Sequence, residues 1–131
     1  MNRAQASIGY AAAILIVISG AAHSLVGWKE MHSGLKASTA TPELIKALGI
    51  GWVFGGVAML VLGSIAIAST VKRSHDPTAS LLPVRIIGIA YVAFGAGAMS
   101  ITGFDPFFLV FILPGILLVA ASWPARAKGT A

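Results

Sequence analysis

The sequence predicts an all-α integral membrane protein, with four transmembrane helices in an antiparallel up-down bundle that forms a single domain over residues 1–131. One observation is composition: 57% of the residues are hydrophobic and 10% are charged, with a mean hydropathy of +0.90, whereas soluble domains carry about 25% charged residues. The other is spacing. Four stretches hold no Asp, Glu, Lys or Arg, namely residues 4–28, 47–71, 86–104 and 106–125. About 20 apolar residues cross the hydrocarbon core as a helix, the form that satisfies the backbone in lipid.

The same composition excludes several other classes of protein. Disordered chains need low hydrophobicity and dense charge. The chain has no Cys, which removes disulfides, thiolate metal sites and cysteine nucleophiles. Its net charge is +5, but the basic residues do not form one patch, so a nucleic-acid partner is not expected. The lipid bilayer is the expected environment.

The first span is predicted over residues 5–28. Gly20, His23, Ser24 and Gly27 recur at i, i+3, i+4 and i+7, which places them on one helix face. Apolar side chains gain little by leaving lipid for protein, so helix association relies on small residues that let backbones approach. Gly20 and Gly27 are therefore predicted helix-packing positions.

The second span is predicted over residues 44–71, after a long loop at residues 29–46. Thr41 offers an N-cap hydroxyl, Pro42 suits the first helical position, and Glu43 places a carboxylate at the helix N-terminus. The predicted packing positions of this span are Gly51, Gly55, Gly56 and Gly63.

The third and fourth spans are predicted over residues 83–104 and 106–124. Their connection is very short, so they should form an antiparallel hairpin. Pro114 removes a backbone hydrogen bond near the middle of the fourth span, and Pro114 with Gly115 is a predicted hinge. The predicted packing positions are Gly95 and Gly103.

The distribution of charge predicts the orientation. With four spans, both termini lie on one side, and that side holds Arg3, Lys72, Arg73, Arg85, Arg126 and Lys128. The opposite side holds Lys29, Lys36 and Lys46 together with Glu30, Glu43 and Asp105. Basic residues favour the cytoplasmic side, so a multi-pass protein with both termini in the cytoplasm, in a bacterial inner membrane, is expected.

His23 is the only ionisable side chain well inside a charge-free stretch, and such residues are candidate functional groups. Counting residues from the helix ends places Trp52, Met99 and Phe111 at a similar depth. These three side chains and His23 are predicted to form one layer in the outer leaflet, a candidate binding site for an apolar cofactor or lipid. A structural role for His23, as a hydrogen bond to a hydroxyl or carbonyl of a neighbouring helix, is the first interpretation, and the ligand role is its alternative.

No catalytic motif is present: the sequence lacks a nucleophile–base pair, a Walker loop, a dinucleotide fingerprint and paired carboxylates, and no metal site is expected. The leading hypothesis is a non-enzymatic bundle, either an accessory or scaffold subunit of a larger membrane complex or a self-associating protein. The first alternative is a binder of a haem, chlorin, quinone or lipid at His23. The second is a small oligomeric transporter, motivated by a weak similarity between residues 54–59 and 94–99 and by the predicted hinge.

Overall fold

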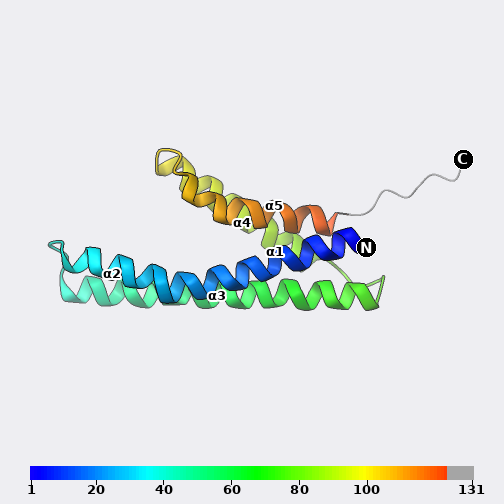
Figure 1. Ribbon diagram of the computed structural model, residues 1–131, viewed down its shortest axis with the longest axis horizontal. Coiled ribbons are helices and arrows are strands. Elements are labelled where there is room, and N and C mark those ends of the chain that lie inside the picture. The colour runs from blue at the N-terminus through cyan, green and yellow to red at the C-terminus, as the bar shows by residue number, and fades with distance from the viewer. Residues whose placement is uncertain (124–131) are drawn as a thin grey trace, which may run out of the picture.

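The computed structural model describes residues 1–123, and every regular element in this part of the chain is helical. Figure 1 shows the arrangement. In chain order the elements are α1 (Arg3–Ala22), the π-helix η1 (His23–Gly27), α2 (Trp28–Lys36), α3 (Pro42–His75), α4 (Leu82–Ile101), the 3-10 helix η2 (Pro106–Phe108) and α5 (Leu109–Ser122). Three segments, Arg3–Lys36, Pro42–His75 and Leu82–Ile101, are long and apolar enough to cross a membrane, and the fourth, Pro106–Ser122, is shorter.

The first helix continues beyond its predicted end. α1, η1 and α2 form one segment of 34 residues, about 51 Å long at 1.5 Å per residue. The polar residues after Trp28 extend the helix to Lys36 instead of forming a loop over residues 29–46, and the turn covers only residues 37–41. The physical reason is that α3 also begins early and offers a surface for α2. An added Cβ at Gly49 of α3 would lie 2.6 Å from the Trp28 ring.

The start of α3 confirms the predicted cap. Thr41 Oγ1 accepts a hydrogen bond from the Leu44 amide at 3.3 Å, Pro42 occupies the first turn, and Glu43 lies beside it. α3 then runs for 34 residues to His75, beyond the predicted end at residue 71.

The helices form a four-cornered bundle. α1 packs against α3 and α5, and α4 packs against α5 and α3, so each helix contacts two antiparallel neighbours. We call the end that holds Met1, His75 and Trp123 the terminal end, and the end that holds the turns at residues 37–41 and 102–105 the loop end. Figure 1 shows the α1–α3 and α4–α5 hairpins close together near the terminal end and apart at the loop end.

Residue size differs between the two ends of the bundle. Near the terminal end the contact surfaces consist of small residues: an added Cβ at Gly9 of α1 would lie 3.3 Å from Thr70 Oγ1 of α3 and 3.5 Å from the Ala121 Cβ of α5. Toward the loop end the facing side chains include Phe94 and Phe111. Small residues permit close approach of helices, whereas Phe94 and Phe111 pack on each other within the α4–α5 hairpin and line a cavity between the hairpins. The buried core accordingly lies toward the terminal end, with Ala12, Ala13, Ile16, Ala66, Val84, Ile87 and Leu118.

Most of the predicted packing glycines lie at helix contacts. A Cβ added to Gly20 would lie 2.9 Å from the carbonyl oxygen of Gly56. A Cβ added to Gly63 would lie 3.1 Å from that of Ala13, and one added to Gly95 would lie 3.1 Å from that of Phe108. Gly51 is different, since nothing lies within 4 Å of its added Cβ. Gly103 lies in the turn after α4 with a φ of +70°, a conformation that glycine adopts without steric penalty.

The last hairpin places the predicted hinge inside a helix contact. α5 continues through Pro114 without a break in its helical assignment. Pro114 and Gly115 are both buried, and an added Cβ at Gly115 would lie 2.8 Å from Gly88 O of α4. The helix ends at Ser122; residue 124, the predicted end of the span, lies outside the described residues, as do Arg126 and Lys128.

The outside of the bundle is apolar along its length. Leu25 is 75% exposed and Phe54 is 71% exposed, and many further aliphatic side chains are also exposed. Such an exterior is compatible with lipid contact and would be costly in water.

Candidate functional site

A π-helical turn shapes the backbone at His23. Over residues 23–27 the Trp28 amide donates to the His23 carbonyl, one residue further along than in an α-helix. The same carbonyl accepts a second hydrogen bond, from Trp52 Nε1 of α3 at 2.7 Å. π-turns of this kind are rare and occur frequently at functional sites.

The imidazole of His23 is held between two residues of α3. It stacks on the indole of Trp52 with ring centroids 4.3 Å apart and an interplanar angle of 6°. Gly55 leaves the space that the ring occupies, because an added Cβ there would lie 3.3 Å from His23 Nε2. Within residues 1–123 neither ring nitrogen makes a hydrogen bond, so both are available to a ligand.

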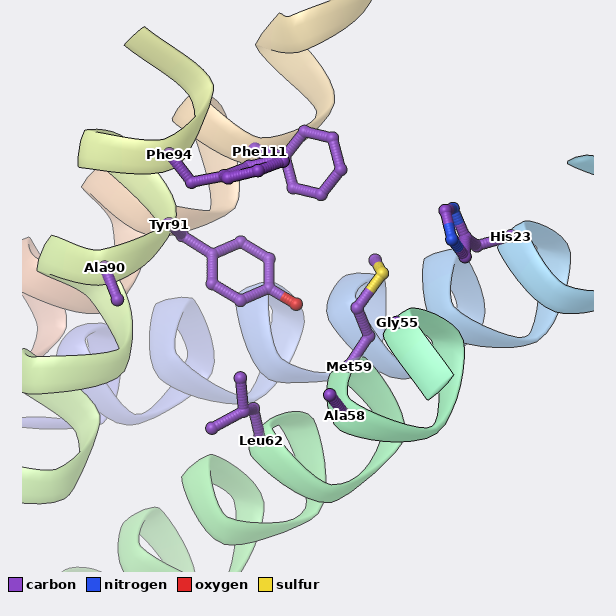
Figure 2. Close-up of a pocket in the computed structure, with 9 residues that line it drawn as sticks. All are labelled: His23, Gly55, Ala58, Met59, Leu62, Ala90, Tyr91, Phe94 and Phe111. Carbon is purple, nitrogen blue, oxygen red and sulfur yellow. The ribbon is translucent and has the colours of Figure 1, made fainter. Parts of the chain in front are cut away.

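The His23 ring borders a cavity of about 350 Å³ between the two hairpins. Figure 2 shows the side chains around it. The cavity is partly open and almost wholly apolar, and its lining residues are His23, Gly55, Ala58, Met59, Leu62, Ala90, Tyr91, Phe94 and Phe111.

A second cavity of about 280 Å³ lies between α1 and α5. His23, Met59 and Phe111 line both cavities, so these three side chains separate them. The first cavity, at about 350 Å³, lies within the range of small-molecule sites, about 300–1,000 Å³, and the second lies just below it.

Tyr91 supplies the second polar group of the first cavity. The residue is 6% exposed, and its hydroxyl is buried without a hydrogen-bond partner within the described residues. Figure 2 shows the hydroxyl pointing away from α4 toward Met59 and Leu62 of α3, while the His23 ring lies on the far side of Met59. A buried hydroxyl without a partner is unfavourable by about 1–3 kcal/mol. The hydroxyl oxygen is itself closed to the cavity in this conformation, so a ligand oxygen would remove that penalty only after displacing the Met59 side chain.

Aromatic rings form the wall of the cavity toward the loop end. The Phe111 ring centroid lies 4.9 Å from that of Phe94, in an edge-on arrangement, and 5.9 Å from that of Tyr91. This geometry is favourable for aromatic pairs. The wall is therefore preformed and suits a flat apolar group.

The structure brings together three of the four residues of the predicted layer. His23, Trp52 and Phe111 all lie at the cavities, but Met99 lines neither of them. Met59 provides the thioether instead. The physical reason is that Met99 lies two residues before the end of α4, and Figure 1 shows that α4 diverges from α3 toward the loop end.

Tyr91 and Met59 were not among the residues expected from the sequence. Both tyrosines of the chain, Tyr10 and Tyr91, lie within charge-free stretches, so the sequence offered no signal that distinguishes Tyr91. Comparisons with protein-family models, curated proteins and solved structures return no match to this chain. The function is therefore argued from the site itself.

Proposed function

We propose that the protein binds a lipid-soluble molecule in the cavity between its two hairpins. The observation that carries this proposal is the buried Tyr91 hydroxyl, which lacks a partner within the described residues and points toward Met59 at the wall of an apolar cavity that His23 also borders. A site with apolar walls and a few convergent polar groups is the usual form of a small-molecule pocket. The role is non-enzymatic.

A quinone-type carbonyl compound fits the two polar groups best. Tyr91 can donate a hydrogen bond, and the His23 ring has two nitrogen atoms that can take part in one. Polar groups on opposite sides of the cavity match a ring with oxygens at both ends. A haem or chlorin would use one His23 nitrogen as a metal ligand and leave the Tyr91 hydroxyl unpaired.

Quenching of tryptophan fluorescence by a short-chain quinone tests the proposal, because Trp52 stacks on His23 at the cavity. Titration of detergent-solubilised protein should give saturable quenching. Tyr91→Phe removes the hydroxyl alone and should weaken binding about tenfold, the effect of losing roughly 1.4 kcal/mol.

Tyr10→Phe is the matched control. The Tyr10 hydroxyl lies 3.5 Å from Ser74 Oγ and takes no part in the cavity. Its variant should bind as the wild type does. Equal affinity of the Tyr91→Phe and Tyr10→Phe variants, or quenching that never saturates, would refute a quinone site at Tyr91.

The proposed orientation places the terminal end in the cytoplasm of a bacterial cell, with the chain in the inner membrane. Among the residues near that end are Arg3, Lys72, Arg73 and Arg85, whereas Lys29, Lys36 and Lys46 near the loop end are accompanied by acidic residues. The positive-inside rule supports this orientation.

A second proposed function, as an accessory or self-associating subunit, is favoured by the length of the first hairpin. Two helical segments of 34 residues, about 51 Å each, exceed the roughly 30 Å of hydrocarbon, so α2 and the start of α3 extend into the headgroup region or beyond. This extension offers a surface for a partner. Native electrophoresis of gently solubilised membranes should then show an assembly larger than the 13.4 kDa chain; a monomer would contradict it.

The transporter hypothesis finds less support. Neither of the two cavities is lined by an Asp or Glu of the described residues. Proton- and ion-coupled transporters commonly use such groups within the membrane.

A further inference from the structure

A polar cavity lies at the terminal end of the bundle, separate from the proposed quinone site. Its volume is about 310 Å³, and all four long helices or the loops beside them contribute to it. Two arginines line it, Arg73 near the end of α3 and Arg85 in the first turns of α4.

Each guanidinium is held in place by one backbone carbonyl. Arg73 Nη1 donates to Ala79 O at 2.7 Å, and Arg85 Nη2 donates to Ser122 O at 2.8 Å. The Trp123 ring also packs on Arg85, with the ring centroid 5.4 Å from Cζ. These contacts position the two cations without neutralising either charge.

Both guanidinium groups retain unused donors. The Nε atoms of Arg73 and Arg85 are buried and have no hydrogen-bond partner within residues 1–123. An arginine carries five N–H donors in a planar fork. The buried Nε atoms are themselves closed to the cavity, but each guanidinium uses only one Nη donor on a carbonyl, so its other Nη donors remain for a ligand that accepts several hydrogen bonds.

No carboxylate of the described residues lines this cavity. The nearby Asp76 is engaged in its own turn, where its Oδ1 accepts hydrogen bonds from the Thr78 amide at 2.8 Å and from Thr78 Oγ1 at 2.6 Å. The sequence after Trp123 adds Arg126 and Lys128 but no acidic side chain. The electrostatic balance of the cavity is therefore positive.

The start of α4 adds to this potential. Leu81, the N-cap residue, lines the cavity, and the first turn of α4 has no acidic residue; the Leu82 amide donates to Ser80 Oγ at 3.1 Å, and Pro83 has no N–H. Helix N-termini carry partial positive charge and bind anions.

We propose that this cavity binds a phosphate group, held by the forked donors of Arg73 and Arg85. Arginine forks match phosphate oxygens in geometry and charge. The two arginines lie where the apolar parts of α3 and α4 end, at the depth of lipid headgroups, so the phosphate comes from an anionic phospholipid or from a soluble phosphate compound.

Native mass spectrometry of the detergent-solubilised protein, titrated with phosphatidylglycerol, tests the proposal. The wild type should retain one lipid, and Arg73→Gln or Arg85→Gln should raise the lipid concentration needed by about tenfold. Lys72→Gln is the control, because it removes the same charge from an exposed neighbour outside the cavity, and it should behave as the wild type does.

Two added anions distinguish the sources. If millimolar inorganic phosphate displaces the lipid from the wild type but not from the Arg85→Gln variant, the site is assigned to soluble phosphates. If phosphate has no effect, the site is assigned to the lipid. Oleate, an anion without phosphate, should not displace the lipid. Equal lipid retention in the Lys72→Gln and Arg85→Gln variants, or displacement by oleate, would overturn the proposal.

A folding defect in the glutamine variants would be recognised by their thermal unfolding temperature. Arg85→Lys then serves as the second variant, since it keeps the charge and loses the fork. It should still weaken lipid retention, by about threefold. Retention equal to that of the wild type would contradict a site that depends on the fork.

Discussion

Tyr91 keeps a polar atom in an apolar cavity, and it does so without the compensation that buried hydroxyls usually have. A hydroxyl in this state destabilises the ligand-free fold, and a ligand that accepts its hydrogen bond would remove that destabilisation. His23 resembles Tyr91 in this respect: its ring packs between Trp52 and Gly55, but its ring nitrogens make no hydrogen bond within the described residues.

The stability of the ligand-free protein should reflect this state. Tyr91→Phe removes an unsatisfied hydroxyl, so we expect the free energy of unfolding to stay unchanged or to rise by up to about 1 kcal/mol. Reversible unfolding of delipidated protein in mixed micelles measures it. A loss of more than about 1 kcal/mol would mean that the hydroxyl has a partner in the ligand-free protein.

Asp76 gives a pH-dependent contribution at the turn between α3 and α4. The hydrogen bonds from the Thr78 side chain and amide lower the pKa of its carboxyl group below the ordinary value of 3.8. Because the folded-state pKa is depressed, the carboxylate stabilises the turn above that ordinary value, and the contribution is lost as the pH falls through the folded-state pKa. An NMR titration should show the pKa of Asp76 rising toward 3.8 in Thr78→Val; an unchanged pKa would contradict this cause.

At the residue scale the sequence identified His23 but not Tyr91. An imidazole inside a charge-free stretch is unusual, whereas a tyrosine in an apolar helix is ordinary until its hydroxyl is seen without a partner. Met99 was expected beside His23 because depth along a helix can be counted in residues. The direction in which α4 leaves the bundle cannot be obtained by counting residues.

At the scale of the helices, charge-free stretches predict where helices exist but not where they end. A change from apolar to polar sequence does not interrupt backbone hydrogen bonding, so α2 continues to Lys36. The π-turn at His23 depends on the Trp52 side chain of another helix. No local pattern could have predicted it.

Two glycines of α3 provide a matched test of helix contact. An added Cβ at Gly56 would lie 2.8 Å from Gly20 O and would collide with Ser24 Oγ, while the same atom at Gly51 meets nothing within 4 Å. Gly56→Ala should therefore destabilise the protein by about 1–3 kcal/mol, and Gly51→Ala should be neutral or stabilising by up to about 1 kcal/mol. Unfolding in mixed micelles measures both, and equal effects would contradict the contact between α1 and α3.

At the scale of the whole molecule, the two hairpins meet at the terminal end, where small residues allow close contact, and separate toward the loop end. The separation creates the cavities, and the convergence brings Arg73 and Arg85 to one site. Four apolar helices were predictable from the sequence; the angle between the hairpins was not, because it depends on which side chains face each other.

Insertion and orientation can be tested with single cysteines, since the chain contains none. Thr39→Cys and His75→Cys place exposed thiols beyond opposite ends of α3, and Leu25→Cys places one on the apolar exterior. An impermeant maleimide should label Thr39→Cys in intact cells, label His75→Cys only after permeabilisation, and leave Leu25→Cys unlabelled. Labelling of His75→Cys in intact cells would contradict the proposed orientation, and labelling of Leu25→Cys would contradict lipid contact.

Identification of the small molecule that co-purifies with the protein tests the central claim most directly. The protein is taken gently from its own membranes, and bound molecules are extracted and identified by mass spectrometry for the wild type, Tyr91→Phe and Tyr10→Phe. The account predicts a carbonyl-bearing, lipid-soluble compound at about one molecule per chain in the wild type and Tyr10→Phe, and about a tenfold loss in Tyr91→Phe. A wild-type protein without such a compound, or equal amounts in all three, would contradict it.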